Sequence, residues 1–201
     1  FGTILIGKQI YNVGRSNYYG ALWSNGNTKT TSASALLNHS LNKNWKLNFN
    51  SSYQNYDREW KGTERIQITN PNGTWSRPLG QYKNLEAILG EQISLQGCFK
   101  TGSIKHQTFS GIDFENSIAT ANTFVFSPAN YDTINVFTFE PNNQATTEPN
   151  AVNTRKVITT TNRFGIYAQD LISFNEKFKI LAGIRWSWQE AQAATHNLLA
   201  S

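Results

Sequence analysis

Charged residues are scarce in this sequence: Asp, Glu, Lys and Arg make up 15% of its 201 residues, whereas globular domains average about 25%. Long hydrophobic runs are absent as well, and no segment approaches the roughly 18 apolar residues of a membrane-spanning helix. The sequence therefore does not encode a helical membrane protein. Spanning β-strands are compatible with it, because they alternate apolar and polar residues and average to a middling hydropathy, here −0.49.

Cysteine occurs once, so Cys98 has no partner for an internal disulfide and no neighbour at zinc-ligand spacing. His39, His106 and His196 lie far apart in the sequence, and we predict no metal site and no cofactor. The net charge is +5, but Lys and Arg are scattered singly along the chain, which argues against nucleic-acid binding. No set of nucleophile, base and acid stands out, so we predict no enzymatic activity.

Three segments alternate apolar and polar residues with a period of two, which is typical of β-strands with two different faces. They cover residues 45–53, 85–99 and 178–188. Glu91 is an exception in the second segment, because it falls on the apolar side. The apolar face of the third segment carries Phe178, Ile180, Ala182, Ile184, Trp186 and Trp188. This pattern predicts an all-β fold.

Each of these strands is predicted to pair with a neighbour through a short polar turn. The neighbours are predicted at residues 29–41, 105–116 and 163–174, and the turns at 42–44, 101–103 and 175–177. Asn and Gly in these turns favour tight hairpins, because both tolerate a positive φ angle. The chain is thus predicted to form three hairpins.

The remaining connections are predicted to be long loops, at residues 61–80 and 116–157. Compact soluble domains rarely contain structureless loops longer than about 15 residues. Short turns on one side and long loops on the other are typical of outer-membrane barrels, whose periplasmic turns are short and extracellular loops long. We therefore predict a partial transmembrane antiparallel β-barrel of about six strands, in contact with outer-membrane lipid.

The third hairpin, RFGIYAQDLISFNEKFKILAGIRWSWQ, resembles the barrel signature of TonB-dependent siderophore receptors. The segment ISLQGCFKTGSIKHQTFSGIDFENS is similar to another hairpin of that family, and NKNWKLNFNSSYQNYDREW to an earlier one. These passages cover less than half of the chain. The residues of the third hairpin that carry the resemblance are Tyr167, Gln169, Asp170, Phe178, Gly183, Arg185 and Trp186.

The resemblance implies a bacterial outer-membrane barrel of about 22 strands with a plugged lumen. It also implies import of ferric siderophores, energised through the TonB complex. Six strands cannot close such a barrel, and nothing here resembles the plug or the segment that contacts TonB. We therefore expect residues 1–201 to be a fragment of the barrel, with the plug and the other strands encoded elsewhere in the gene product. A sheet with two open edges is not expected to transport anything alone.

Aromatic and Arg side chains in or beside the predicted outer loops are the candidates for ligand binding. Aromatic faces and guanidinium groups could hold a bulky anionic or hydroxamate ligand. Two alternatives stay open, namely that Tyr56 and Tyr82 belong to an interfacial aromatic girdle and that the others pack within the loops. Iron would arrive already chelated, so the protein need supply no metal ligand. The candidates are Tyr56, Trp60, Arg65, Trp75, Arg77, Tyr82 and Tyr131.

Two other functions compete with siderophore uptake. One is a soluble β-sandwich that binds carbohydrate on exposed Trp and Tyr side chains, but the long strands and loops argue against it. The other is a TonB-dependent transporter for a different ligand, such as a glycan or cobalamin, which only the plug and the complete outer loops would distinguish.

Overall fold

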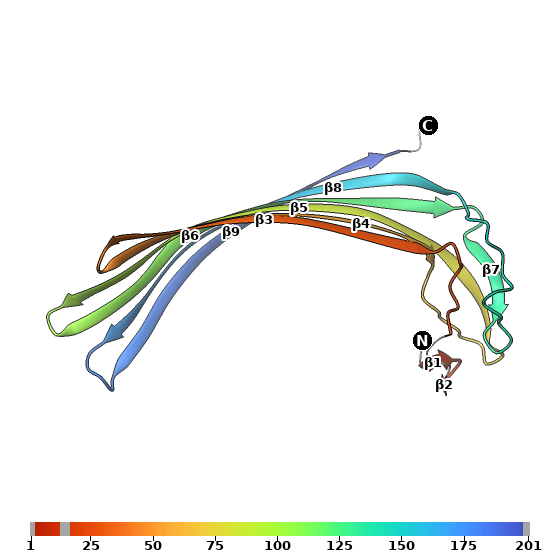
Figure 1. Cartoon of the computed structure of the whole chain (residues 1–201), viewed down its shortest axis with the longest axis horizontal. Coiled ribbons are helices and arrows are strands. Elements are labelled where there is room, and N and C mark those ends of the chain that lie inside the picture. Colours follow the sequence, from red (N-terminus) through yellow and green to blue (C-terminus); the bar gives the residue numbers. More distant parts are fainter. Residues whose placement is uncertain (1–2, 13–16, 199–201) are drawn as a thin grey trace.

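The computed structural model describes residues 3–12 and 17–198, and nine β-strands form its regular structure (Figure 1). Within these ranges there is no helix of the length and hydrophobicity needed to cross a membrane. The strands are β1 (Thr3–Ile6), β2 (Gln9–Asn12), β3 (Asn25–Asn42), β4 (Trp45–Thr63), β5 (Thr74–Thr101), β6 (Ile104–Phe126), β7 (Asn130–Asn135), β8 (Ala151–Ser173) and β9 (Lys179–Asn197).

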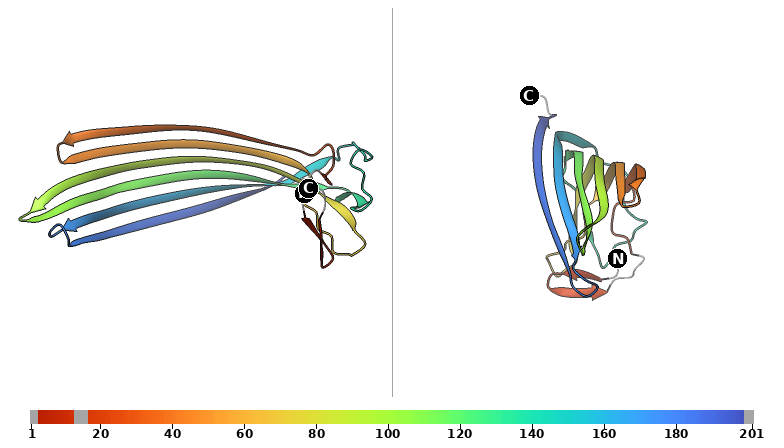
Figure 2. Two further views of the ribbon diagram at one scale, coloured as in Figure 1. Left: turned by 60° about the horizontal axis from the view of Figure 1, so that its bottom comes forward. Right: turned by 90° about the vertical axis from the view of Figure 1, so that its left-hand side faces the viewer.

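The six long strands form one antiparallel sheet in the order β3-β4-β5-β6-β8-β9, while β7 pairs only with the first part of β5. The sheet is a single arched layer, with its short turns at one end and β7 and the β1–β2 hairpin at the other (Figures 1 and 2). We call these the turn end and the loop end. Within the described residues no second sheet covers either face, so the β-sandwich alternative is wrong and the predicted partial barrel of three hairpins is confirmed.

Polar side chains and one glycine close the three predicted turns. Asn42 Oδ1 accepts hydrogen bonds from the backbone amides of Asn44 and Trp45, at 2.8 and 3.1 Å. Asn175 plays the same part in the third turn, and Gly102 adopts φ +63° in the second. The sequence signals for these turns therefore act through side-chain acceptors and through the left-handed backbone that glycine tolerates.

The strands extend much further toward the loop end than the sequence predicts. β4 ends at Thr63 and β5 begins at Thr74, so the first predicted loop shrinks to residues 64–73. β6 and β8 stay paired from Ser117↔Thr161 up to Phe126↔Ala151. These parts lack clear alternation, but a β-ladder requires only backbone hydrogen bonds, and Thr-rich segments suit it. Strands β1, β2 and β7 were also not predicted.

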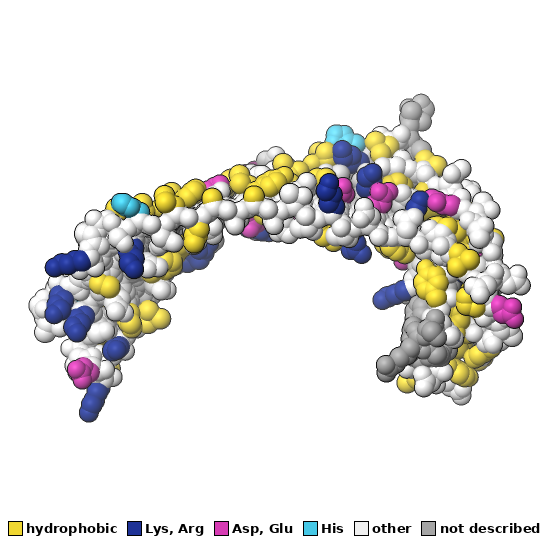
Figure 3. Space-filling view, in the orientation of Figure 1, with side chains coloured by type: hydrophobic (Ala, Val, Ile, Leu, Met, Phe, Trp, Pro, Cys, Tyr) yellow, Lys and Arg dark blue, Asp and Glu magenta, His cyan; other side chains and the backbone are white. Residues whose placement is uncertain are grey.

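The registers bring the predicted apolar faces onto the same side of the sheet. Figure 3 shows apolar side chains along the convex side of the arch, which we call the outer face; the concave side is the inner face. Among residues 3–12 and 17–198 no protein layer covers the outer face, and a large exposed apolar surface marks contact with a membrane or a partner. One row across the six strands reads Leu37, Phe49, Ile93, Ile112, Ile166 and Trp186.

Candidate functional site

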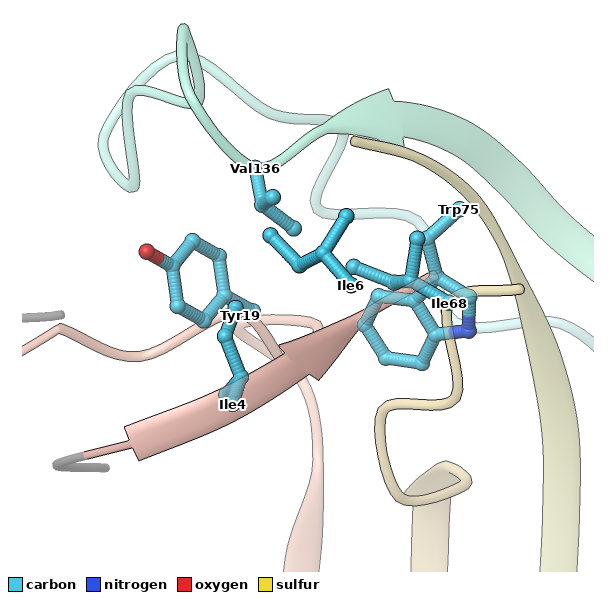
Figure 4. Close-up of a cluster of buried hydrophobic side chains, with 6 residues drawn as sticks. All are labelled: Ile4, Ile6, Tyr19, Ile68, Trp75 and Val136. Carbon is cyan, nitrogen blue, oxygen red and sulfur yellow. The ribbon is translucent and has the colours of Figure 1, made fainter. Parts of the chain in front are cut away.

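The buried core of the described chain lies at the loop end rather than within the sheet. The β1–β2 hairpin, residues 17–24, the 64–73 loop and residues 130–150 meet there, and we call this assembly the cap. Gly7 N donates to Ile68 O at 3.1 Å, which ties the hairpin to the loop. The apolar centre of the cap consists of Ile4, Ile6, Tyr19, Ile68, Trp75 and Val136 (Figure 4).

Arg77 links separate segments of the cap. Its side chain is 0% exposed, and its Nε donates to Asp132 Oδ1 at 2.6 Å while Nη2 contacts the other carboxylate oxygen. Nη1 donates to Tyr19 O at 3.0 Å and to Gln144 Oε1 at 2.9 Å. The guanidinium also lies 5.2 Å from the ring centroid of Tyr131. A buried arginine with a carboxylate partner and further acceptors is fully engaged, so Arg77 acts here as a structural link.

A hollow of about 650 Å³ opens at the base of the cap, and three of the predicted binding residues line it. Tyr82 donates a hydrogen bond to Glu64 Oε1 at 2.8 Å, and its ring stacks on Trp60 at 5.1 Å between centroids. Both rings project from the inner face of the sheet, on the directly paired residues Trp60↔Tyr82. The lining residues are Glu64, Arg65, Gln67, Trp75, Ser76, Pro78 and Tyr82.

The hydrogen bond to Glu64 also raises the pKa of the Tyr82 phenol above its ordinary value, because it stabilises the protonated form. Tyr82 lies on the loop side of Leu85, and the next outer-face residues of β5, Lys83 and Gln81, are polar and pair with Glu59 and Lys61. Tyr82 is therefore outside the apolar band. The hollow thus offers a neutral phenol, a carboxylate and the exposed Arg65 side chain. The Arg65 guanidinium and the aromatic rings suit a ligand that combines aromatic surface with negative charge, whereas Glu64 Oε1 is already engaged by Tyr82.

The other predicted binding residues fall into two groups. Trp75, which is 5% exposed, Arg77 and Tyr131 are packed inside the cap, as the loop-packing alternative expected. Tyr56 lies on the inner face, paired with Glu86 and outside the hollow. The girdle alternative is wrong for Tyr56 and Tyr82, because a lipid girdle would require the outer face. Ligand contact by any of the seven stays a prediction.

Two of the family-motif residues belong to a polar clasp across four strands of the inner face. Arg185 on β9 reaches Asp113 on β6 through two hydrogen bonds of 2.8 Å. Tyr167 on β8 lies beneath the guanidinium and accepts a hydrogen bond of 2.8 Å from Gln92 on β5. Gly165 makes the reach possible, because a Cβ at this position would lie 2.1 Å from Arg185 Nη2.

Gly111 has the same effect in the neighbouring part of the clasp. A Cβ there would lie 2.5 Å from the backbone oxygen of Ile93 and 2.6 Å from the Tyr167 hydroxyl. Gly111 and Gly165 therefore leave the space that the side chains of Tyr167 and Arg185 occupy in the clasp.

Three further motif residues lie nearer the turn end. Asp170 is on the outer face and contacts His106 Nδ1 at 2.6 Å, while the His106 ring stacks on Phe99. Gln169 and Gly183 are paired on the inner face, where a Cβ on Gly183 would meet Gln169 Cβ at 3.1 Å. No group of three or more potential metal ligands is present among residues 3–12 and 17–198.

Sequence reasoning missed the partners of the predicted residues. Asp132 is 55 positions away from Arg77, and Gln144 is 67 away, so no local pattern indicates either contact. Glu64 lies 18 positions from Tyr82 and was hidden within a predicted loop. The predicted exception, Glu91, accepts a hydrogen bond of 2.9 Å from Ser51 Oγ, which satisfies part of its polar side chain on the outer face.

A long antiparallel sheet with an apolar convex face, a polar concave face and a cap at one end defines a segment of a transmembrane barrel wall. Residues 3–200 match the family described as TonB dependent receptor-like, beta-barrel. The chain belongs to this family, whose siderophore receptors are outer-membrane barrels.

Individual relatives agree with this assignment. The catecholate siderophore receptor Fiu of Escherichia coli K12 is 24% identical over 178 residues, which cover 84% of this chain and 23% of Fiu. The closed crystal form of Fiu superposes with a TM-score of 0.75 and 21% identity over 88% of this chain and 26% of that one. Pseudomonas aeruginosa FpvA, bound to a heterologous pyoverdine, superposes with a TM-score of 0.77 and 17% sequence identity. This match covers 98% of this chain and 27% of FpvA. At these identities the structural likeness establishes the fold.

Proposed function

We propose that this chain is part of the wall of an outer-membrane receptor that takes up ferric siderophores with energy supplied through TonB. Family membership supports transport as the class of activity. The relatives that match are named as siderophore receptors, and the chain spans 23% of the length of Fiu, so the activity belongs to a larger molecule. The chelate, rather than a resident metal, is the substrate.

The outer face supports placement in a lipid bilayer. Its apolar rows cross all six long strands, and Trp45 and Phe99 stack at the turn end, where aromatic side chains meet an interface. The outer face also contains a shallow apolar hollow over Ser110 and Ala168, flanked by Ile112 and Trp186, which lipid chains would fill. The turn end then faces the periplasm and the cap faces outward.

The hollow at the base of the cap is the proposed part of the ligand site within this chain. The observation that carries this proposal is the convergence of Arg65, from the 64–73 loop, with the stacked Trp60 and Tyr82 rings of the inner face at the loop end of the sheet. An exposed guanidinium beside aromatic faces favours an anionic chelate with flat surfaces.

The test is uptake and binding by the complete receptor, produced in iron-starved cells that lack other siderophore receptors. Radiolabelled iron would be supplied as a catecholate or a hydroxamate chelate, with cobalamin and an oligosaccharide as competing cargoes. We expect uptake of an iron chelate, and Arg65→Gln should weaken its binding about tenfold, the loss of one charge-assisted contact.

Lys29→Gln is the matched control, because it removes the same charge from the outer face of the sheet. Lys29 lies on β3 directly opposite Asp57 of β4 in the strand register. Its binding should equal that of the unaltered receptor. Uptake of cobalamin or oligosaccharide instead of iron would reassign the cargo and leave the transporter assignment intact. A correctly inserted receptor that imports none of these cargoes would overturn the proposed function.

A further inference from the structure

Six lysines that are scattered in the sequence gather at the turn end of the sheet. Lys100 and Lys105 occupy directly paired positions on β5 and β6, and Lys105 and Lys179 both pair with Ser173 on β8. Adjacent strands are about 4.8 Å apart, so this row of three lysines spans roughly 15 Å. Lys46 on β4 shares the inner face with this row.

Lys43 and Lys177 lie in the adjoining turns and complete the set, which we call the basic rim. Figure 3 shows basic side chains gathered at the turn end. In the sequence, Glu176 is the one acid in residues 42–46, 98–107 and 173–181. Every member of the basic rim is exposed, and none of them makes an ion pair with another described residue.

Such an arrangement is unfavourable unless something neutralises it. Like charges directly opposite each other on paired strands destabilise a sheet. Neighbouring lysines of this row lie within about 10 Å of each other, which is close to the Debye length in physiological salt. Salt therefore screens their repulsion only in part. An anionic partner would therefore stabilise the basic rim.

A hollow of about 590 Å³ on the inner face adjoins the basic rim. Lys43 and Lys46 border it, and Gln96, Gln107 and Gln169 contribute side-chain amides. Ammonium and amide donors together match carboxylates and a peptide backbone. Phe109, Leu171 and Leu181 also line the hollow, so it adds a shaped surface of mixed polarity to the charge.

We propose that the basic rim and this hollow bind an acidic polypeptide segment of the same receptor, inside the turn end of the barrel. Four of the six lysines project from the inner face, whereas lipid headgroups surround the outer face. The chain spans 23% of the length of Fiu, so most of a receptor of that size lies outside it. The inference rests on the barrel placement proposed above but not on the cargo.

The first test is carbodiimide cross-linking of the complete receptor in outer-membrane vesicles, followed by peptide mass spectrometry. This reagent joins a lysine amine directly to a carboxylate that contacts it. We expect cross-links from Lys100 or Lys105 to Asp or Glu residues of the receptor that lie outside residues 1–201. They should be lost in the double variant Lys100→Gln/Lys105→Gln.

The second test is the sign of a thermal shift at low salt. With a bound acidic segment, the double variant unfolds at a lower temperature, because the segment loses its partners. With lysines that face only water, the same variant unfolds at a higher temperature, because a repulsion is removed. Lys83→Gln/Lys156→Gln, which removes two outer-face lysines near the loop end, should leave the midpoint unchanged.

A higher midpoint together with no cross-link would overturn the proposal. Cross-links only to a different protein, or loss of co-purifying anionic phospholipid in the double variant without any cross-link, would overturn it in favour of that partner. Neither experiment uses an iron chelate, so a receptor that fails to import iron still gives a clear result here.

Discussion

Replacing Arg77 by glutamine should loosen the cap and leave the sheet intact. The change removes both hydrogen bonds to Asp132 and the contacts with Tyr19 O and Gln144. Breaking a buried ion pair by removing one partner costs about 3–5 kcal/mol. The Asp132 side chain remains 34% exposed, so water recovers part of this, and we expect about 2–3 kcal/mol.

This free energy corresponds to a roughly 30- to 150-fold larger population of the opened cap. Amide hydrogen exchange of the complete receptor, read by mass spectrometry, measures it directly. Peptides from residues 64–80 and 130–150 should exchange faster by that factor, whereas peptides from the centres of β6 and β8 should not change. Arg77→Lys should give an intermediate value, because lysine keeps the charge but lacks the planar fork.

Arg65→Gln is the matched control for this prediction. Arg65 is exposed and makes no ion pair with another described residue, so its loss should leave exchange in the cap within about twofold, as for other surface substitutions. Unchanged cap exchange in Arg77→Gln would refute the reasoning. Equal acceleration in the cap and in the sheet would refute it as well, since it would mean global rather than local opening.

Three further outcomes are expected. Gly111→Ala should destabilise the folded receptor by about 1–3 kcal/mol in detergent unfolding, because the added Cβ overpacks against the β5 backbone. Gly183→Ala should change the stability by no more than about 0.5 kcal/mol. Equal values for the two variants would contradict the contacts of these glycines. Phe49→Lys on the outer face should cost about 2–4 kcal/mol in lipid, whereas Asn50→Lys on the inner face should cost far less, and reversed values would invert the two faces. Tyr82 should ionise above pH 10, as measured by difference absorbance against Tyr82→Phe. Its hydrogen bond to Glu64 therefore contributes stability below pH 10, which is lost as the pH rises through the pKa of Tyr82 in the folded protein. An ionisation below pH 10 would exclude the bond.

The sequence predicts those parts of the fold in which a local pattern sets the physics. Alternation placed Phe49 and Ile93 on the same face, and the register pairs them directly. Asn42 and Gly102 marked their turns for reasons internal to each turn. The loop ends of the strands were missed, because residues such as Thr161 pair through the backbone without any alternation to announce it.

The site shows the same division. Trp60 and Tyr82 were identified as aromatic residues near a loop, but their stacking depends on the pairing of β4 with β5. In the sequence, Arg77 is as good a candidate for ligand binding as Arg65. Only the fold shows that its guanidinium is bound to the Asp132 carboxylate. Burial of a charged side chain follows from long-range contacts, which composition and spacing along one chain do not contain.

The order of the strands has a consequence for how such a wall is built. Each long strand pairs with the long strand before and after it in the chain, so the sheet grows by adding one hairpin at a time to an open edge. Contacts between chain neighbours carry a small loop-closure cost and favour fast assembly. In a receptor that extended this wall, the free edges of β3 and β9 would be the templates on which further strands register. Closure of the ring would then be the last step rather than the first.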